Sequence, residues 1–423
     1  MGGGPGRRHT AALAVACFAL VAAAPAGAAP VRCSGSHWVG AWGASPSHAA
    51  VPGYAGQTLR MLVTPNAGGR LARVRLTNRY GTAPVTFDAV RLARRASGAG
   101  VVAGTSRPVT FGGRRSITIA RGADAVSDPV RIRFRAFQQL AVSVYARADT
   151  GPATTHFLAS EPSTYVAAGD HTADRGGAAF GEPQESWVFL DGVDVLAPAR
   201  VGAVVALGDS ITDGALSTEA RATGARDTRW PDFLARRLVR AGRPLAVVNE
   251  GIGGNRIRLD AVPTSPEIFG PSTLFRLDGD VLAVSGATDV IVLEGINDIG
   301  QDPPATAAQV IAGLQQVVTR LQVAGLRVLV GTLTPSGGMG VPTYGSAAAG
   351  AIRRAVNRWI RGSRLPDGIV DFDAAVRDPS RPSRIRPAYD SGDHLHPNAR
   401  GYRAMGDAVR LSALRGSGCG PAS

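Results

Sequence analysis

The sequence contains no lysine, and this absence determines how its charge is carried. Its 46 basic side chains are therefore all arginines, against 32 acidic ones, which gives a net charge of +14 and a pI near 10.9. So high a pI is typical of nucleic-acid-binding proteins. Here, however, the arginines are scattered along the chain, many at alternating positions of strand-like segments, where we expect them only to solvate one face. We therefore predict no nucleic-acid partner, and only a general attraction to acidic polymers.

Long apolar runs are also scarce. One such run, Ala11–Ala24, follows Arg7 and Arg8 and precedes the small residues Ala26-Gly27-Ala28. A basic start, a short apolar core and small exit residues predict a secretory signal peptide over residues 1–28, with an N-terminal membrane anchor as the alternative. No later stretch approaches a membrane span. We expect a secreted, extracellular protein of bacterial type, without stable membrane insertion.

Cysteine is also rare in this sequence. Of three cysteines, Cys17 lies in the predicted signal peptide, which leaves Cys33 and Cys419 near the two ends of the chain. In an oxidising compartment these predict a disulfide, with two free thiols as the alternative. Beyond Asp393 and His396, the sequence has no group of histidine and acidic residues at metal-ligand spacing. We therefore predict no metal and no cofactor.

The first half of the chain has the pattern of an all-β domain. Segment 130–135, for example, alternates as Val-Arg-Ile-Arg-Phe-Arg, and clusters of Gly, Pro, Asn and Asp separate such runs. Many short strands with turns between them predict a β-sandwich or jelly-roll-like accessory domain over residues 36–196. Trp38, Trp42 and Trp187 are candidate sugar-stacking platforms, but buried core aromatics are the favoured interpretation.

The second half alternates between apolar strands and amphipathic helices, which predicts a doubly wound parallel α/β domain over residues 200–415. The strands are expected at Ala203–Leu207, Leu245–Val248, Asp289–Leu293, Arg327–Leu333 and Ile369–Phe372. Helices are expected from Trp230-Pro231-Asp232 onward and at Ala307–Val323, Ala348–Ile360 and Pro397–Leu411. In such a sheet the site lies beyond the carboxyl ends of the strands.

The first of these strands ends at Gly208-Asp209-Ser210, a turn that would present a serine hydroxyl to solvent. A serine nucleophile needs a neutral imidazole as base and a carboxylate to orient that imidazole. His394 and His396 are the only histidines after residue 200, and Asp393 stands three positions before His396. We favour Ser210, His396 and Asp393 as a catalytic triad, with His394 as a support. In the alternative, Asp393 caps the following helix and His396 is structural.

A serine nucleophile that attacks a carbonyl carbon also needs hydrogen-bond donors for the oxyanion of the tetrahedral intermediate. The candidates are the backbone N–H groups of Ser210 and Gly254 and the side-chain amide of Asn297, each after a predicted strand. Glycine allows a backbone N–H to approach closely because it has no side chain. The alternatives are a plain turn at Gly253-Gly254 and a helix cap at Asn297.

Four ordered blocks across residues 201–411 resemble those of the SGNH (GDSL) hydrolase superfamily. They are Gly208-Asp209-Ser210, the glycine after the second strand, Gly295-x-Asn297-Asp298 and Asp393-x-x-His396. The resemblance implies a flavodoxin-like five-stranded α/β/α fold and ester hydrolysis through an acyl-enzyme.

Carried over residue by residue, the resemblance makes Ser210 the nucleophile, with His396 and Asp393 as the other two members of the triad. It completes the oxyanion hole with Asn297 and with Gly254, although Gly253 is a competing alignment. Asp209 and Asp298 would be supporting hydrogen-bonding residues.

The Trp38–Trp42 opening and the β-rich first half resemble a secreted bacterial subgroup whose members are often called xylan-esterase-like. We predict a monomeric, secreted serine esterase acting on small-molecule or polysaccharide esters, with short acyl groups such as acetyl on carbohydrate. The alternatives are a lipase or phospholipase for longer acyl chains, and a glycan- or cell-wall-binding protein with a vestigial hydrolase domain.

Overall fold

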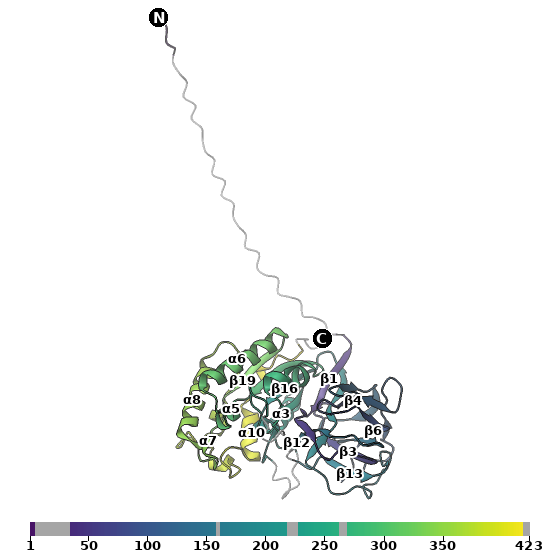
Figure 1. The fold of residues 1–423 in the computed structure, drawn as a ribbon. Coiled ribbons are helices and arrows are strands. Elements are labelled where there is room, and N and C mark those ends of the chain that lie inside the picture. The colour runs from purple at the N-terminus through teal and green to yellow at the C-terminus, as the bar shows by residue number, and fades with distance from the viewer. Residues whose placement is uncertain (5–33, 158–160, 218–226, 262–268, 418–423) are drawn as a thin grey trace.

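The computed structural model describes residues 1–4, 34–157, 161–217, 227–261 and 269–417. Residues 5–28 of the predicted signal peptide and both cysteines of the predicted disulfide lie outside the described residues. Two regions lie side by side, an all-β region in purple to teal and an α/β region in teal to yellow (Figure 1). No helix of the described residues is long and apolar enough to cross a membrane.

Among its described residues, the all-β region contains two five-stranded antiparallel sheets, in the orders β1-β15-β4-β10, with β9 paired to β4, and β13-β3-β11-β6-β7. Two smaller sheets, β14-β12-β2 and β5-β8, complete it. The strands are β1 (Ser36–Gly43), β2 (His48–Ala50), β3 (Gln57–Val63), β4 (Gly69–Thr77), β5 (Val85–Phe87), β6 (Ala89–Arg94), β7 (Arg107–Pro108), β8 (Ile117–Ile119), β9 (Asp124–Val126), β10 (Val130–Phe134), β11 (Leu140–Ala146), β12 (Ala153–Phe157), β13 (Thr164–Ala168), β14 (Ser186–Val188) and β15 (Leu190–Pro198). The predicted all-β character is confirmed, whereas the jelly-roll connectivity stays a prediction.

Two of the three tryptophans considered as sugar-stacking platforms are buried core residues, as the favoured interpretation predicted. Trp42 and Trp187 are 5% and 1% exposed and meet edge to face, with ring centroids 5.0 Å apart. Trp38 is half-buried, and the Arg73 guanidinium lies 4.7 Å from its ring centroid. Trp42 and Trp187 therefore cannot serve as sugar-stacking platforms.

The α/β region is built on a parallel sheet in the order β17-β16-β18-β19-β20. In chain order this is 2-1-3-4-5, so the predicted flavodoxin-like sheet is confirmed. The strands are β16 (Gly202–Gly208), β17 (Leu245–Gly251), β18 (Ala287–Leu293), β19 (Arg327–Gly331) and β20 (Gly368–Val370). β16 lies between β17 and β18, so its carboxyl end is next to the point where the strand order reverses.

Helices connect these strands, and α3 packs against α10 while α6 packs against α8 (Figure 1). The helices are α1 (Ser210–Asp213), α3 (Trp230–Arg240), α4 (Thr273–Leu277), η2 (Asp278–Leu282), α5 (Ile296–Gly300), α6 (Ala307–Val323), α7 (Pro342–Gly345), α8 (Ala347–Gly362), α9 (Phe372–Val376), η3 (Pro387–Tyr389), α10 (Ala399–Ala408) and η4 (Leu411–Ala413). The closing helix begins at Ala399, not at Pro397 as predicted, because Pro397 still pairs with Asp390 in a β-bridge.

The two regions meet where β1 crosses β17, and glycines make the close approach possible. A Cβ on Gly43 would lie 2.4 Å from both Val248 Cγ1 and Glu250 Oε1, and one on Gly40 would lie 2.9 Å from Val284. Buried side chains of both regions form one continuous hydrophobic cluster. The domain limits predicted from the sequence stay a prediction, but the all-β region is firmly packed on the α/β region.

Candidate active site

Ser210 is placed by the abrupt end of β16. A Cβ on Gly208 would lie 2.1 Å from Thr212 Oγ1, so only glycine fits where the strand turns into α1. Asp209 is the N-cap of α1, and its Oδ1 accepts the Ile211 N–H at 2.9 Å. Such a side chain fixes the first turn of a helix. Ser210 is thereby held at the first position of α1, 8% exposed.

Ser210, His396 and Asp393 form one chain of hydrogen bonds. Ser210 Oγ lies 2.8 Å from His396 Nε2, and His396 Nδ1 lies 2.5 Å from Asp393 Oδ2. The other carboxylate oxygen, Oδ1, accepts the backbone N–H groups of Leu395 and His396 at 2.9 and 2.8 Å. Burial alone would raise the pKa of Asp393, but the hydrogen bonds from the His396 ring and these amides lower it well below its usual value. The structure thus brings the three predicted triad residues together.

His394 takes no part in this chain. Its backbone has φ 67°, and its Nδ1 lies 2.6 Å from Asp390 Oδ2. Asp390 Oδ1 accepts the His394 N–H at 3.1 Å, so these two hydrogen bonds between Asp390 and His394 close a compact turn. His394 therefore supports the loop that carries Asp393 and His396, as predicted.

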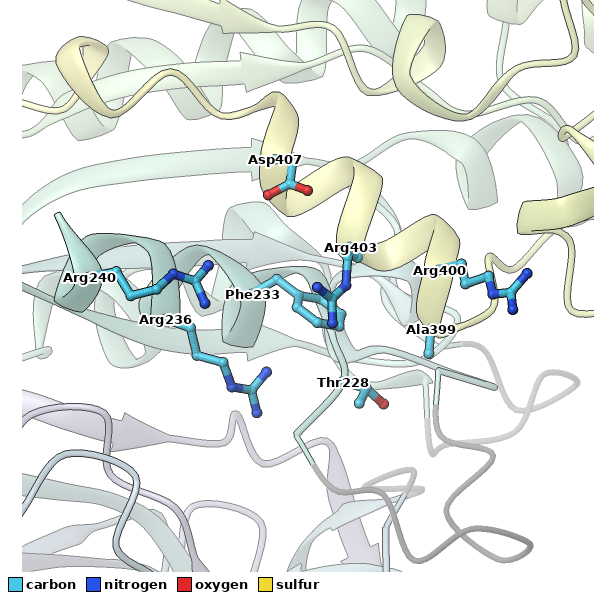
Figure 2. Close-up of a pocket in the computed structure, with 8 residues that line it drawn as sticks. All are labelled: Thr228, Phe233, Arg236, Arg240, Ala399, Arg400, Arg403 and Asp407. Carbon is cyan, nitrogen blue, oxygen red and sulfur yellow. The ribbon is translucent and has the colours of Figure 1, made fainter.

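The loop leads directly into α10, whose N-cap is Asn398. Its Oδ1 accepts the Arg400 and Gly401 N–H groups at 3.0 and 3.1 Å, so the alternative in which Asp393 caps this helix is wrong. Figure 2 shows α10 beside α3, with Arg403 next to Phe233; the guanidinium lies 4.8 Å from the ring centroid. Packing of α10 on α3 therefore fixes where the His396 loop ends.

The two glycines of the candidate oxyanion loop differ in their surroundings. Gly254 has φ +73°, and a Cβ on it would lie 2.2 Å from the Phe269 ring, whereas a Cβ on Gly253 would meet nothing within 4 Å. Only Gly254 therefore requires glycine, and its carbonyl accepts Gln301 Nε2–H at 2.7 Å. Its role as an oxyanion donor stays a prediction.

Asn297 lies in α5, and two hydrogen bonds to other segments orient its side chain. Its Nδ2 donates to Asn255 O at 2.9 Å, and its Oδ1 accepts the Tyr344 O–H at 2.7 Å. The side chain is 2% exposed. Nearby, Asp298 Oδ2 accepts the Ile257 N–H at 2.8 Å, which agrees with the predicted supporting role of Asp298. Sequence reasoning missed Tyr344, which fixes which end of the Asn297 amide is the donor.

Arg276 of α4, which sequence reasoning also missed, ties the strand ends together. Its guanidinium donates to Gly208 O at 2.9 Å, to Glu250 O at 2.7 Å and to Asn255 Oδ1 at 2.9 Å. These acceptors lie at the ends of β16 and β17 and in the loop after Gly254. With a side chain 1% exposed, Arg276 is the buried centre that holds three segments of the site in register.

Buried carboxylates surround Arg276. It lies 3.1 Å from Asp280 and 3.5 Å from Glu294, and Glu250 Oε2 accepts Ser45 Oγ–H at 2.6 Å. Burial raises the pKa of Glu250 and Glu294 well above the usual value, and it raises that of Asp209 to about 7. Arg276 shares Asp280 with Arg79, whose Nη1 lies 2.6 Å from the other carboxylate oxygen, so two arginines supply the positive charge in this acidic cluster.

Replacing Arg276 with glutamine should lower the free energy of unfolding by about 3–5 kcal/mol. Glu294 loses its counter-charge, and the three buried acceptors at the strand ends lose their donor. Urea denaturation followed by fluorescence measures this. Arg147→Gln is the control, since the Arg147 side chain is 77% exposed and its pair with Asp88 is 3.7 Å long. An exposed pair contributes at most about 1 kcal/mol. Equal losses in both variants would contradict the central position of Arg276.

The all-β region reaches the nucleophile helix through His156. Its Nε2 lies 3.2 Å from Asp213 Oδ1 at the end of α1, and its Nδ1 lies 2.6 Å from Ser45 O. The side chains of His156 and Asp213 are nearly fully buried, at 2% and 3% exposed. No local pattern around His156 signalled this contact, which joins residues 57 positions apart.

Comparison with known proteins gives a family match within the α/β region. The GDSL-like Lipase/Acylhydrolase family model matches residues 206–404, while no curated protein matches the chain. Similar solved structures include an aryl esterase from M. smegmatis, with 21% identity, 51% of this chain and 100% of that chain covered and a TM-score of 0.40. A carbohydrate acetylesterase from Sinorhizobium meliloti has 18% identity, 49% and 95% coverage and a TM-score of 0.37. Residues 206–404 thus form a GDSL-like lipase/acylhydrolase domain, and the chain is a carboxylic ester hydrolase.

Proposed function

We propose that the chain is a secreted serine esterase that removes short acyl groups, such as acetyl, from carbohydrate esters through an acyl-enzyme. The observation that carries the serine mechanism is the hydrogen-bond chain from Ser210 Oγ through the His396 ring to Asp393. The sequence features of a signal peptide support secretion. The absence of a long apolar lid segment from the sequence supports short acyl groups.

In the first half of the reaction, His396 Nε2 takes the proton of Ser210 as Oγ bonds to the ester carbonyl carbon. Asp393 stabilises the imidazolium that forms. His396 then gives the proton to the alcohol oxygen, the carbon–oxygen bond breaks, and the acyl group remains on Ser210. In the second half, His396 deprotonates a water that attacks the acyl carbon. The acid leaves, and Ser210 regains its proton from His396.

The oxyanion of each tetrahedral intermediate would be met by the N–H groups of Ser210 and Gly254 and by Asn297 Nδ2. Asn297→Ala should therefore lower kcat for p-nitrophenyl acetate by about 10²–10³-fold, with a smaller change in KM. Steady-state kinetics measure both constants. Tyr344→Phe removes only the hydroxyl that orients Asn297 Oδ1 and should reduce kcat less. A decrease of less than a few-fold in Asn297→Ala would give Asn297 a structural role only.

Substrate class is tested with p-nitrophenyl esters of increasing acyl length beside acetylated xylan and pectin. The proposal expects the highest kcat/KM for acetyl and release of acetate from at least one polysaccharide. A maximum at long acyl chains would contradict it and favour the lipase alternative. Loss of all hydrolysis with retained glycan binding would favour a binding protein with a vestigial hydrolase domain.

A further inference from the structure

Arginines that are far apart in the sequence meet in a groove of the all-β region. The groove has a volume of about 600 Å³ and lies between β6 and β7 on one side and β10 on the other. Its arginines are Arg94, Arg107, Arg131, Arg133 and Arg135. The remaining lining residues are uncharged, so the groove contains five positive charges and no carboxylate.

Strand geometry explains how the arginines become aligned. On β10, Val130, Ile132 and Phe134 are buried, while the residues between and after them, Arg131, Arg133 and Arg135, are exposed. Alternate residues of a strand point to the same side and lie about 7 Å apart. Three guanidinium groups therefore form a row along one wall of the groove, opposite the arginines of β6 and β7.

These charges are not neutralised within the protein. In the part of the chain that the structure describes, the guanidinium groups of Arg94, Arg131, Arg133 and Arg135 have no ion pair and no hydrogen bond, whereas Arg107 donates to Gly104 O at 2.8 Å. The arginines around Phe233 in Figure 2 differ, because that pocket includes Asp407 and two of its guanidinium groups lie over the ring.

Protection of a sheet edge explains only part of this arrangement. β10 and β7 end their respective sheets, and exposed charges on edge strands discourage pairing with other chains. That explanation accounts for the row on β10. It does not explain why Arg94 and Arg107, on the other sheet, face the same cavity without an acidic neighbour. A groove with regularly spaced positive charges on both walls is complementary to a linear polyanion.

We propose that this groove binds an acidic polysaccharide through its carboxylate groups. Guanidinium groups bind carboxylates through paired hydrogen bonds, which gives direction as well as charge complementarity. Single-stranded nucleic acid binds on exposed aromatic rings. The only aromatic residue lining the groove is Phe134, which is 4% exposed, so no ring is available for stacking. The site lies outside the esterase centre and does not depend on the proposed reaction.

The test is binding of polygalacturonate to the full chain, measured by calorimetry at two salt concentrations. The triple variant R131Q/R133Q/R135Q should lower the affinity at least about tenfold, with a weaker dependence on salt. The control R121Q/R358Q/R364Q removes the same charge from three exposed arginines outside the groove and should stay within about twofold. Both variants should keep the unfolding temperature and the rate of p-nitrophenyl acetate hydrolysis, so a failure of binding is distinguishable from a failure of the esterase.

Three outcomes would overturn the proposal. One is absence of binding by the wild-type chain at low salt, and another is an equal loss of affinity in the groove and control variants, which would show an effect of net charge alone. The third is binding of oligo-dT of matched charge as tightly as polygalacturonate, with the same loss in the triple variant, which would assign the groove to nucleic acid instead.

Discussion

Ser210→Ala should reduce kcat for p-nitrophenyl acetate by about 10⁴–10⁶-fold while leaving the protein folded, because no other hydroxyl hydrogen-bonds to His396 among the described residues. The substitution removes one oxygen atom from a site that is 8% exposed, and the N-cap bond of Asp209 that shapes the turn is unaffected. We expect an unchanged unfolding temperature. Initial rates at saturating substrate and thermal unfolding measure the two properties.

Ser217→Ala is a matched control for this prediction. Ser217 lies in the segment after α1, is fully buried, and its Oγ has no hydrogen-bond partner within the described residues. Removing a buried, unpaired hydroxyl is neutral or stabilising, so this variant should keep full activity. If Ser210→Ala retained more than about a tenth of the wild-type rate, the serine mechanism would be excluded.

That Ser210, Asp393 and His396 lie together was predictable, because a rule of topology brings their segments to one place. Parallel strands end at the same edge of the sheet, so a serine after the first strand and a loop before the last helix are brought to one place. The base could then be only one of two residues, since His394 and His396 are the only histidines after residue 200. The choice between them followed from spacing, and the structure agrees, because His394 binds Asp390 instead.

Arg276 and His156 could not be predicted, because their partners lie far away in the sequence and no spacing or scarcity distinguishes them. Arg276 is one of 46 arginines, and its partners Gly208 and Glu250 lie 68 and 26 positions away. Nothing near it in the sequence distinguishes it from a surface arginine. His156 is likewise an ordinary strand residue until the two regions pack together. Contacts between distant segments depend on the tertiary packing, which local patterns do not encode.

The arginine groove corrects the impression given by the sequence that the basic residues are scattered. Arg94 lies on β6, Arg107 on β7, Arg131 and Arg133 on β10, and Arg135 directly after β10. The alternation on β10 was interpreted only as a solvated face. That interpretation was right about the direction of the side chains. It missed that two sheet edges converge, which converts a solvated face into the wall of a cavity.

Asp393→Asn should lower kcat by about 10²–10⁴-fold with little change in KM, because it reverses a hydrogen bond rather than removing one. Oδ1 of residue 393 accepts two backbone N–H groups, so the asparagine oxygen should keep that position and its NH₂ group should face His396 Nδ1. Nδ1 then has to accept, which places the ring proton on Nε2. In that tautomer Nε2 cannot take the proton of Ser210.

Asp390→Asn provides the same chemical change on the neighbouring histidine. Asp390 Oδ2 lies 2.6 Å from His394 Nδ1, and its Oδ1 accepts the N–H groups of Gly392 and His394, so the two aspartates have closely similar surroundings. We expect a decrease in kcat of no more than a few-fold, because His394 does not contact Ser210. Comparable losses of kcat in the two variants would show that both act through the shape of the loop, and Asp393 would lose its assigned role in orienting the base.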